Sequence, residues 1–167
     1  MSANLREKYY LVQFKILQKE YDTFWYTDDE DGFMLDTDNR LKSFPTKEEA
    51  VDYADKEGFI LDTEAFLVST SILKDMNIRK INCKLYLSYW NIFSDVAHSI
   101  NGQFLGDSRN SIIRHIYEKL FYGCNILVKK DEEHYIPKWS KSERRWIARV
   151  IKNGFQIVSK GLNADWH

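Results

Sequence analysis

Apolar side chains recur at three- and four-residue spacing in segments 83–100, 110–123 and 142–161, and this periodicity constrains the fold more than any other feature. Such spacing gathers the apolar residues on one face of an α-helix, which must be buried against other elements. In the first segment the face comprises Tyr86, Tyr89, Trp90, Phe93, Val96, Ala97 and Ile100. A capping box at Ser140 begins the last helix, and Gly154 inside it allows a break. We expect a C-terminal helical bundle.

The first third of the chain has a different pattern. Residues 8–16 are rich in aromatic and β-branched side chains, which is typical of a strand. The short aromatic segments 22–28 and 32–38 flank an acidic turn, in which Asp31 and Gly32 suit a tight hairpin. We expect an antiparallel strand pair about this turn.

A helix is predicted between Thr46 and Gly58, because Thr46 with Glu49 makes a capping box and Gly58 suits the C-terminal cap. Residues 59–64 follow as a strand. Residues 63–77 favour helix, and their Val, Ser and Thr content leaves a strand as the alternative. The fold class is therefore α+β: a small N-terminal antiparallel sheet with one helix, followed by a C-terminal helical bundle. We expect one domain over 1–167, with a β-rich acidic part (1–64) and a helical part (65–167).

Composition limits the cellular location. The chain has 167 residues, 44% of them apolar, and no apolar run approaches the length of a membrane span. Its first residues lack the apolar core of a signal peptide. Two cysteines, Cys83 and Cys124, do not form a disulfide scaffold and fit a reduced cytosol. We expect a soluble cytoplasmic protein with no membrane partner.

Charge divides the chain more sharply than its net value of −1 indicates. Residues 22–64 carry fourteen acidic and four basic side chains, whereas residues 65–167 carry nine acidic and sixteen basic ones. Residues 26–39 contain the acidic cluster Asp28, Asp29, Glu30, Asp31, Asp36 and Asp38 with no basic residue. Such asymmetry concerns partners and steering rather than fold, unless the two parts only complement each other.

Metal and nucleophile signatures do not account for the acidic cluster. A calcium loop starting at Asp36 would need an oxygen ligand, a glycine and a glutamate where Arg40, Leu41 and Lys47 stand. The cysteines and histidines lack zinc spacing, and neither a G-x-S-x-G element nor a phosphate loop occurs. We expect no metal, no cofactor and no catalytic nucleophile.

Two other patterns leave alternatives open. The segment "RNSIIRH" resembles the R-N-x-x-x-x-H element of HEPN-type ribonucleases, which implies acid–base cleavage by His115 with Arg109 steadying phosphate; otherwise both residues belong to a polar helix face. The basic segment 141–152, with Trp139 and Trp146, has the composition of a nucleic-acid surface. Its charges alternate with the inward stripe, however, and the acidic part would repel phosphate. We therefore expect no direct nucleic-acid partner.

The segments "LSYWNIFSDVAHSI", "IYEKLFYGCN", "YIPKW" and "RRWIARVIKNGFQIV" resemble the C-terminal half of some bacterial immunity proteins, the cytosolic antidotes of polymorphic-toxin and contact-dependent growth inhibition systems. The resemblance covers residues 82–158. It implies a non-enzymatic protein that binds one cognate toxin domain in the cytoplasm, frequently a nuclease with a basic active site.

With this resemblance, we expect from charge alone that the acidic cluster is the surface on which the toxin docks. Opposite fields raise association rates, and neighbouring aromatic side chains supply desolvated anchors unless they are core residues. The predicted toxin-binding residues are Asp28, Asp29, Glu30, Asp31, Asp36, Asp38, Trp25 and Tyr26, with Phe24 and Phe33 as further candidate anchors. An adaptor for another basic partner has the same signature.

Overall fold

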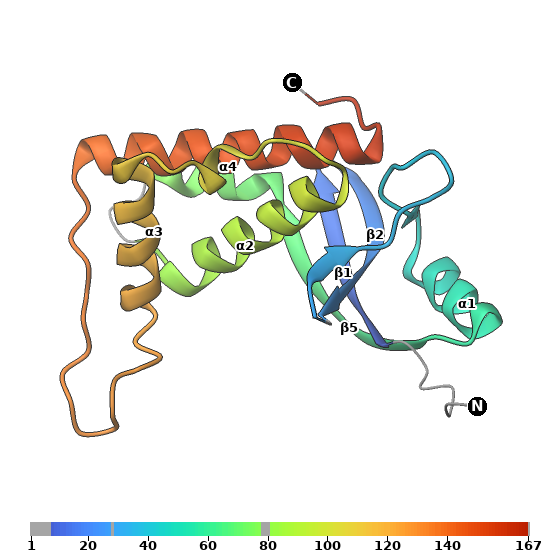
Figure 1. Ribbon diagram of the computed structural model, residues 1–167, viewed down its shortest axis with the longest axis horizontal. Helices are drawn as coiled ribbons and strands as arrows, with labels where there is room; N and C mark the ends of the chain where they lie inside the picture. The colour runs from blue at the N-terminus through green and yellow to red at the C-terminus, as the bar shows by residue number, and fades with distance from the viewer. Residues whose placement is uncertain (1–7, 28, 78–80, 167) are drawn as a thin grey trace.

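The computed structural model describes residues 8–27, 29–77 and 81–166 (Figure 1). Its strands are β1 (Lys8–Ile16), β2 (Lys19–Thr27), β3 (Asp31–Phe33), β4 (Ser43–Phe44) and β5 (Ile60–Ser69). Its α-helices are α1 (Lys47–Glu57), α2 (Cys83–Ser99), α3 (Ser111–Gly123) and α4 (Lys141–Leu162), with short 3₁₀ helices η1 (Thr70–Asn77) and η2 (Leu105–Asp107). The α+β class with a sheet before the helices is confirmed.

The sheet is mixed, and the expectation of a purely antiparallel sheet was wrong. Its strand order is β3-β2-β1-β5, with β4 also paired to β2. β1 is antiparallel to β2 but parallel to β5, with Phe14 opposite Val68. Residues 63–69, for which helix was expected, continue β5, because pairing with β1 satisfies their backbone groups and buries Val68 completely. The β-rich part therefore extends to Ser69 rather than ending at residue 64.

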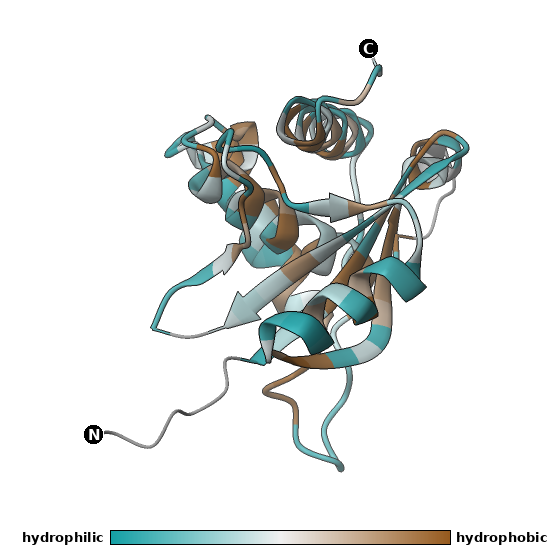
Figure 2. Cartoon of the chain, turned by 90° about the vertical axis from the view of Figure 1, so that its right-hand side faces the viewer, coloured by the Kyte–Doolittle hydropathy of each residue, from teal (hydrophilic) through white to brown (hydrophobic). Residues whose placement is uncertain are grey.

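The sheet separates two apolar layers. Successive side chains of a strand point to opposite faces, so Leu11 packs with Ala50 and Ala54 of α1, while Val12 belongs to the large core under α2 and α4. Figure 1 shows the sheet between α1 and α2, and Figure 2, seen from the side of α1, shows that helix crossing in front of the strands. This layering leaves one sheet face directed at α2.

The helical half follows its apolar periodicity. The capping box at Ser140 is confirmed, since its hydroxyl accepts from the Glu143 amide at 3.0 Å while the Glu143 carboxylate accepts from the Ser140 amide. α4 runs unbroken through Gly154, where the missing side chain makes room for the Phe93 ring of α2. Among the described residues, no helix combines the length and apolar character needed to cross a bilayer.

The glycine beside the acidic turn has a different place from the one expected. Gly32 lies within β3, buried and opposite Tyr26, and the turn itself precedes it. A Cβ at this position would lie 2.5 Å from the Tyr26 hydroxyl oxygen, so the glycine admits a ring packed across the strand. Close approach, not a positive φ, explains this glycine.

Candidate functional site

A cleft of about 610 Å³ lies between the sheet and α2. The strands contribute Tyr10, Leu11, Val12, Trp25, Asp31, Glu64 and Phe66, and α2 contributes Ser88, Asn91, Ile92, Ser94 and Asp95. Concave sites with apolar walls and a few convergent polar groups are the usual places where proteins bind ligands. This cleft is therefore the candidate functional site.

The strand register explains why these side chains meet. Tyr10 lies opposite Trp25 in the β1–β2 pair, and residues opposite one another in antiparallel strands share a face. Their rings lie 5.6 Å apart between centroids. Asp31 of β3 lies opposite Thr27, two residues beyond Trp25, so its carboxylate shares the face directed at α2. Together these residues form an aromatic wall with an acidic rim.

Asp95 of α2 faces this wall. Its Oδ2 accepts a hydrogen bond from Trp25 Nε1 at 2.9 Å, which joins α2 to β2 across the cleft. Burial raises the pKa of the Asp95 carboxyl to about 6; the hydrogen bond from Trp25 opposes this shift, and the charge of Asp31 adds to it. The His98 and Asp107 charges make smaller, opposite contributions to the pKa. Asp95 thus ionises at some cost to the folded chain, and a cation in the cleft would remove part of that cost.

Every charged side chain that the structure places in the cleft lining is acidic. Among the described residues, the lining contains the carboxyl groups of Asp31, Glu64 and Asp95 and no Lys, Arg or His. At its margin the Lys8 ammonium lies 5.0 Å from the Tyr10 ring centroid, so the aromatic wall already carries one cation–π contact. The arrangement suits a basic side chain whose apolar stem lies against aromatic rings while its charge meets the carboxylates.

A larger hollow, of about 800 Å³, lies beside η2 and has fewer charged side chains in its lining. Its charged or titratable lining residues are His98 and Asp107, and Phe104 supplies its aromatic contact. One carboxyl group attracts a basic partner less strongly than the three carboxyl groups that line the cleft. We therefore place the candidate site in the cleft against α2.

The structure separates the acidic residues that the sequence groups together. Asp31 lines the cleft, and Asp29 and Glu30 are exposed in the adjoining β2–β3 turn, whereas Asp28 lies outside the described residues. Asp36 organises a different turn: its Oδ1 accepts from the backbone amides of Asp38 at 2.8 Å and Arg40 at 3.1 Å.

That second turn belongs to another region of the molecule. The Leu41 amide at its end donates to the Gly161 carbonyl at 2.9 Å, which fixes the turn to the C-terminal end of α4. Asp36 and Asp38 therefore do not line the cleft. The predicted docking surface is divided, and its cleft portion is the Asp29–Asp31 end.

The predicted aromatic anchors also lie in different places, and only some of them reach the cleft. Trp25 lines the cleft, but Tyr26, next in β2, projects from the opposite face and packs edge-on against Tyr9 at 5.9 Å. Phe24 and Phe33 are 1% and 2% exposed, respectively, and belong to the two apolar cores. They are core residues rather than anchors, because burial on this scale leaves no surface for a partner.

The two residues of the ribonuclease hypothesis line different hollows. Arg109 lies before α3 in a hollow shared with Asp107, Arg114 and Tyr117. His115 is exposed on α3 and lines a separate hollow with Lys119 and Tyr122. Cleavage of one phosphodiester needs both groups at the same phosphate. Within one chain, the described residues do not bring Arg109 and His115 into one pocket.

Sequence reasoning missed four residues of the cleft: Asp95, Glu64, Tyr10 and Phe66. One signal existed: Ser88, Asn91 and Asp95 recur at helical spacing and mark a polar flank beside the apolar face of α2. Nothing local indicates that this flank opposes Trp25. In the part of the chain that the structure describes, no group of three or more His, Cys, Asp or Glu side chains could hold a metal ion.

Comparison of the chain with family models, with curated proteins and with solved structures found no match. What the cleft binds is therefore inferred from its own geometry and charge.

Proposed function

We propose that the protein is an immunity protein that binds a cognate toxin domain and neutralises it in the cytoplasm. The cleft between the sheet and α2 receives a basic surface of the toxin, and the partner that best fits this charge is a nuclease whose cationic active site becomes occluded. The observation that carries the proposal is that, in the part of the chain that the structure describes, three carboxyl groups and aromatic side chains line this cleft and no basic residue does.

The physical reasons follow from what neutralisation requires. An antidote must find its toxin quickly, and an acidic cleft facing a basic surface raises the association rate by orders of magnitude. It must also release the toxin slowly, which requires desolvated anchors such as Trp25 and Tyr10 at the centre of the contact. The exposed carboxylates of Asp29 and Glu30 extend the acidic surface beyond the rim. The resemblance of residues 82–158 to immunity proteins gives independent support.

The test is a calorimetric titration of the purified protein against the toxic C-terminal domain encoded immediately upstream, at two salt concentrations. The cleft variant carries Asp31→Asn and Glu64→Gln. The matched control carries Asp52→Asn and Glu57→Gln on α1, which lies on the other side of the sheet and undergoes the same change in net charge. We expect wild-type binding to weaken with salt, and the cleft variant to bind more weakly than the control.

Each outcome decides a separate point. No binding of the wild type would remove the immunity proposal, and equal binding of both variants would keep the role but move the interface elsewhere. Co-expression with the toxin separates an antidote from an adaptor, because only an antidote restores growth. The ribonuclease alternative predicts instead that the protein is itself toxic and that His115→Ala abolishes the toxicity.

A further inference from the structure

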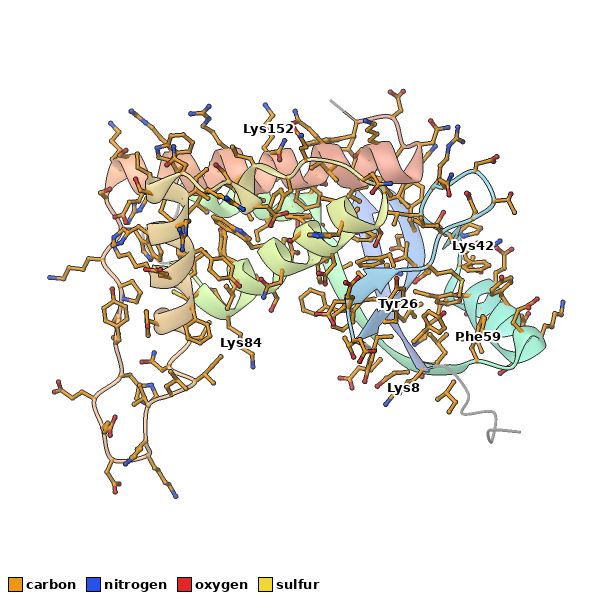
Figure 3. All side chains as sticks on the ribbon, viewed as in Figure 1. Lys8, Tyr26, Lys42, Phe59, Lys84 and Lys152 are labelled. Atoms are coloured by element: carbon orange, nitrogen blue, oxygen red, sulfur yellow. The ribbon has the colours of Figure 1, made fainter. Side chains whose placement is uncertain are left out.

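The outer face of α4 is cationic along its length. The exposed residues of this helix are Lys141, Ser142, Arg145, Arg149, Lys152, Gln156 and Lys160. At 3.6 residues per turn they fall within one sector of about 100°. Figure 3 shows nitrogen-tipped side chains, Lys152 among them, pointing away from the body of the protein on the outer side of α4.

The exposed sector of α4 contains no carboxylate. The acidic residue of α4, Glu143, is turned toward α3, where it pairs with Lys119 at 3.0 Å. Its carboxylate also accepts a hydrogen bond from the backbone amide of the N-cap residue, Ser140. Within the described residues, no ion pair joins Lys141, Arg145, Arg149, Lys152 or Lys160 to an acidic group. An unneutralised row of one sign on a rigid helix favours an anionic ligand.

The burial of α4 narrows the class of ligand. Its apolar face is committed to the core, with Ile147, Val150 and Phe155 all fully buried. Helices that bind lipid surfaces need that face free, and protein interfaces need apolar or aromatic anchors, which the exposed sector lacks. Phosphate groups require only cations and polar hydrogen-bond donors, and the sector contains nothing else.

We propose that the cationic row, defined as Lys141, Arg145, Arg149 and Lys152, binds the phosphate backbone of duplex nucleic acid without reading its base sequence. Eleven residues of helix separate its ends, a span of about 17 Å, or roughly five base pairs of B-DNA. Arg149 lies 4.5 Å from the Trp146 ring centroid, which holds its guanidinium in place.

The row stops before Lys160 for an electrostatic reason. The turn that carries Asp36 and Asp38 is fixed to Gly161 at the C-terminal end of α4, so phosphate is repelled there. This proposal departs from the sequence-based expectation of no direct nucleic-acid partner, because the acidic part meets α4 at that end and leaves the row uncovered. It is independent of toxin binding.

The experiment measures fluorescence anisotropy of a labelled 20-base-pair DNA duplex of arbitrary sequence with the full-length protein between 50 and 200 mM salt. Four phosphate contacts predict a slope of log K against log salt of about −3.6, or a loss of affinity of roughly a hundredfold over this range. Arg145→Gln, Arg149→Gln and Lys152→Gln together should reduce the slope to about −0.9. The matched control changes Lys84, Lys129 and Lys130, all exposed and outside α4, to Gln and should keep the wild-type slope.

Three results would overturn the proposal. The first is no change in anisotropy at 50 mM salt. The second is an equal loss in the control, which would mean that total charge rather than the row attracts the duplex. The third is equally tight binding of poly-glutamate of the same charge, which would mark a general anion surface rather than a phosphate site. Circular dichroism of each variant checks that α4 remains folded.

Discussion

Asp95→Asn should stabilise the folded protein and weaken its binding of a basic partner. An asparagine is isosteric with aspartate, and its carbonyl oxygen still accepts the hydrogen bond that Trp25 Nε1 donates at 2.9 Å. The substitution therefore removes a charge without removing a contact. It tests whether the carboxylate is retained for binding rather than for folding.

The expected gain in free energy of unfolding follows from the pKa of Asp95, which rises from 3.8 to about 6 on folding. Each unit of pKa corresponds to about 1.4 kcal/mol, so ionisation at neutral pH opposes folding by at most about 3 kcal/mol. Asp95 is only half-buried, and solvent screens its charge in part. We expect the variant to gain about 1–2 kcal/mol in free energy of unfolding at pH 7.5.

The direction of this pKa shift also determines the pH range over which the two proteins differ in stability. Because the pKa of Asp95 is higher in the folded than in the unfolded chain, its contribution favours folding below about pH 4 and is lost as pH rises toward and past 6. Wild type and Asp95→Asn should therefore have nearly equal stability at pH 3, below the unfolded pKa, and diverge from pH 4 up to pH 7. Urea unfolding at half-unit pH steps measures the difference. A variant less stable than wild type at pH 7.5, with unchanged far-ultraviolet circular dichroism, would refute the reasoning.

Three further substitutions test the packing of α4 against α2, a buried carboxyl group of β2 and the start of α4. Gly154→Ala should destabilise the protein by about 1–3 kcal/mol in urea unfolding, despite the better helix propensity of alanine, because the added methyl group overlaps the Phe93 ring; an unchanged midpoint would contradict this packing. Asp22→Asn should raise stability at pH 7 by about 1 kcal/mol, since burial raises the pKa of Asp22 and its Oδ2 has no hydrogen-bond partner among the described residues. This gain in stability should vanish in acid, where the Asp22 carboxyl is protonated. A gain that persists in acid would contradict an effect of its charge. Ser140→Ala should cost about 1 kcal/mol by removing the cap of α4, whereas Ser140→Asp should retain most of the stability.

Local rules were enough to predict most elements of this fold. The helix starts at Thr46 and Ser140 and the left-handed cap at Gly58 depend on side chains within four residues, so the sequence displays them directly. Residues 63–69 show the limit of such rules. Their preference is ambiguous, and pairing with β1, about fifty residues earlier in the chain, decides their conformation.

Part of the candidate site could be predicted from the sequence for the same reason. Asp31 and Trp25 lie near each other in the sequence, next to a predicted turn, and both were candidates. Asp95 was not, because it meets Trp25 across seventy residues of sequence, and only the docking of α2 on the sheet brings the two together. Composition alone also cannot show that Asp36 organises a turn instead of facing a partner.

The two proposed surfaces can be separated because they carry opposite charge. Binding at either one weakens with salt, so salt dependence alone does not distinguish a toxin from a duplex. Neutralising Asp31 and Glu64 should slow association with a basic toxin and leave duplex binding unchanged or slightly stronger, since two repelling charges are gone. Neutralising Arg145, Arg149 and Lys152 should have the opposite pattern. If both variants lost both activities together, neither surface would be a specific site, and the charge division of the chain would serve only its own folding.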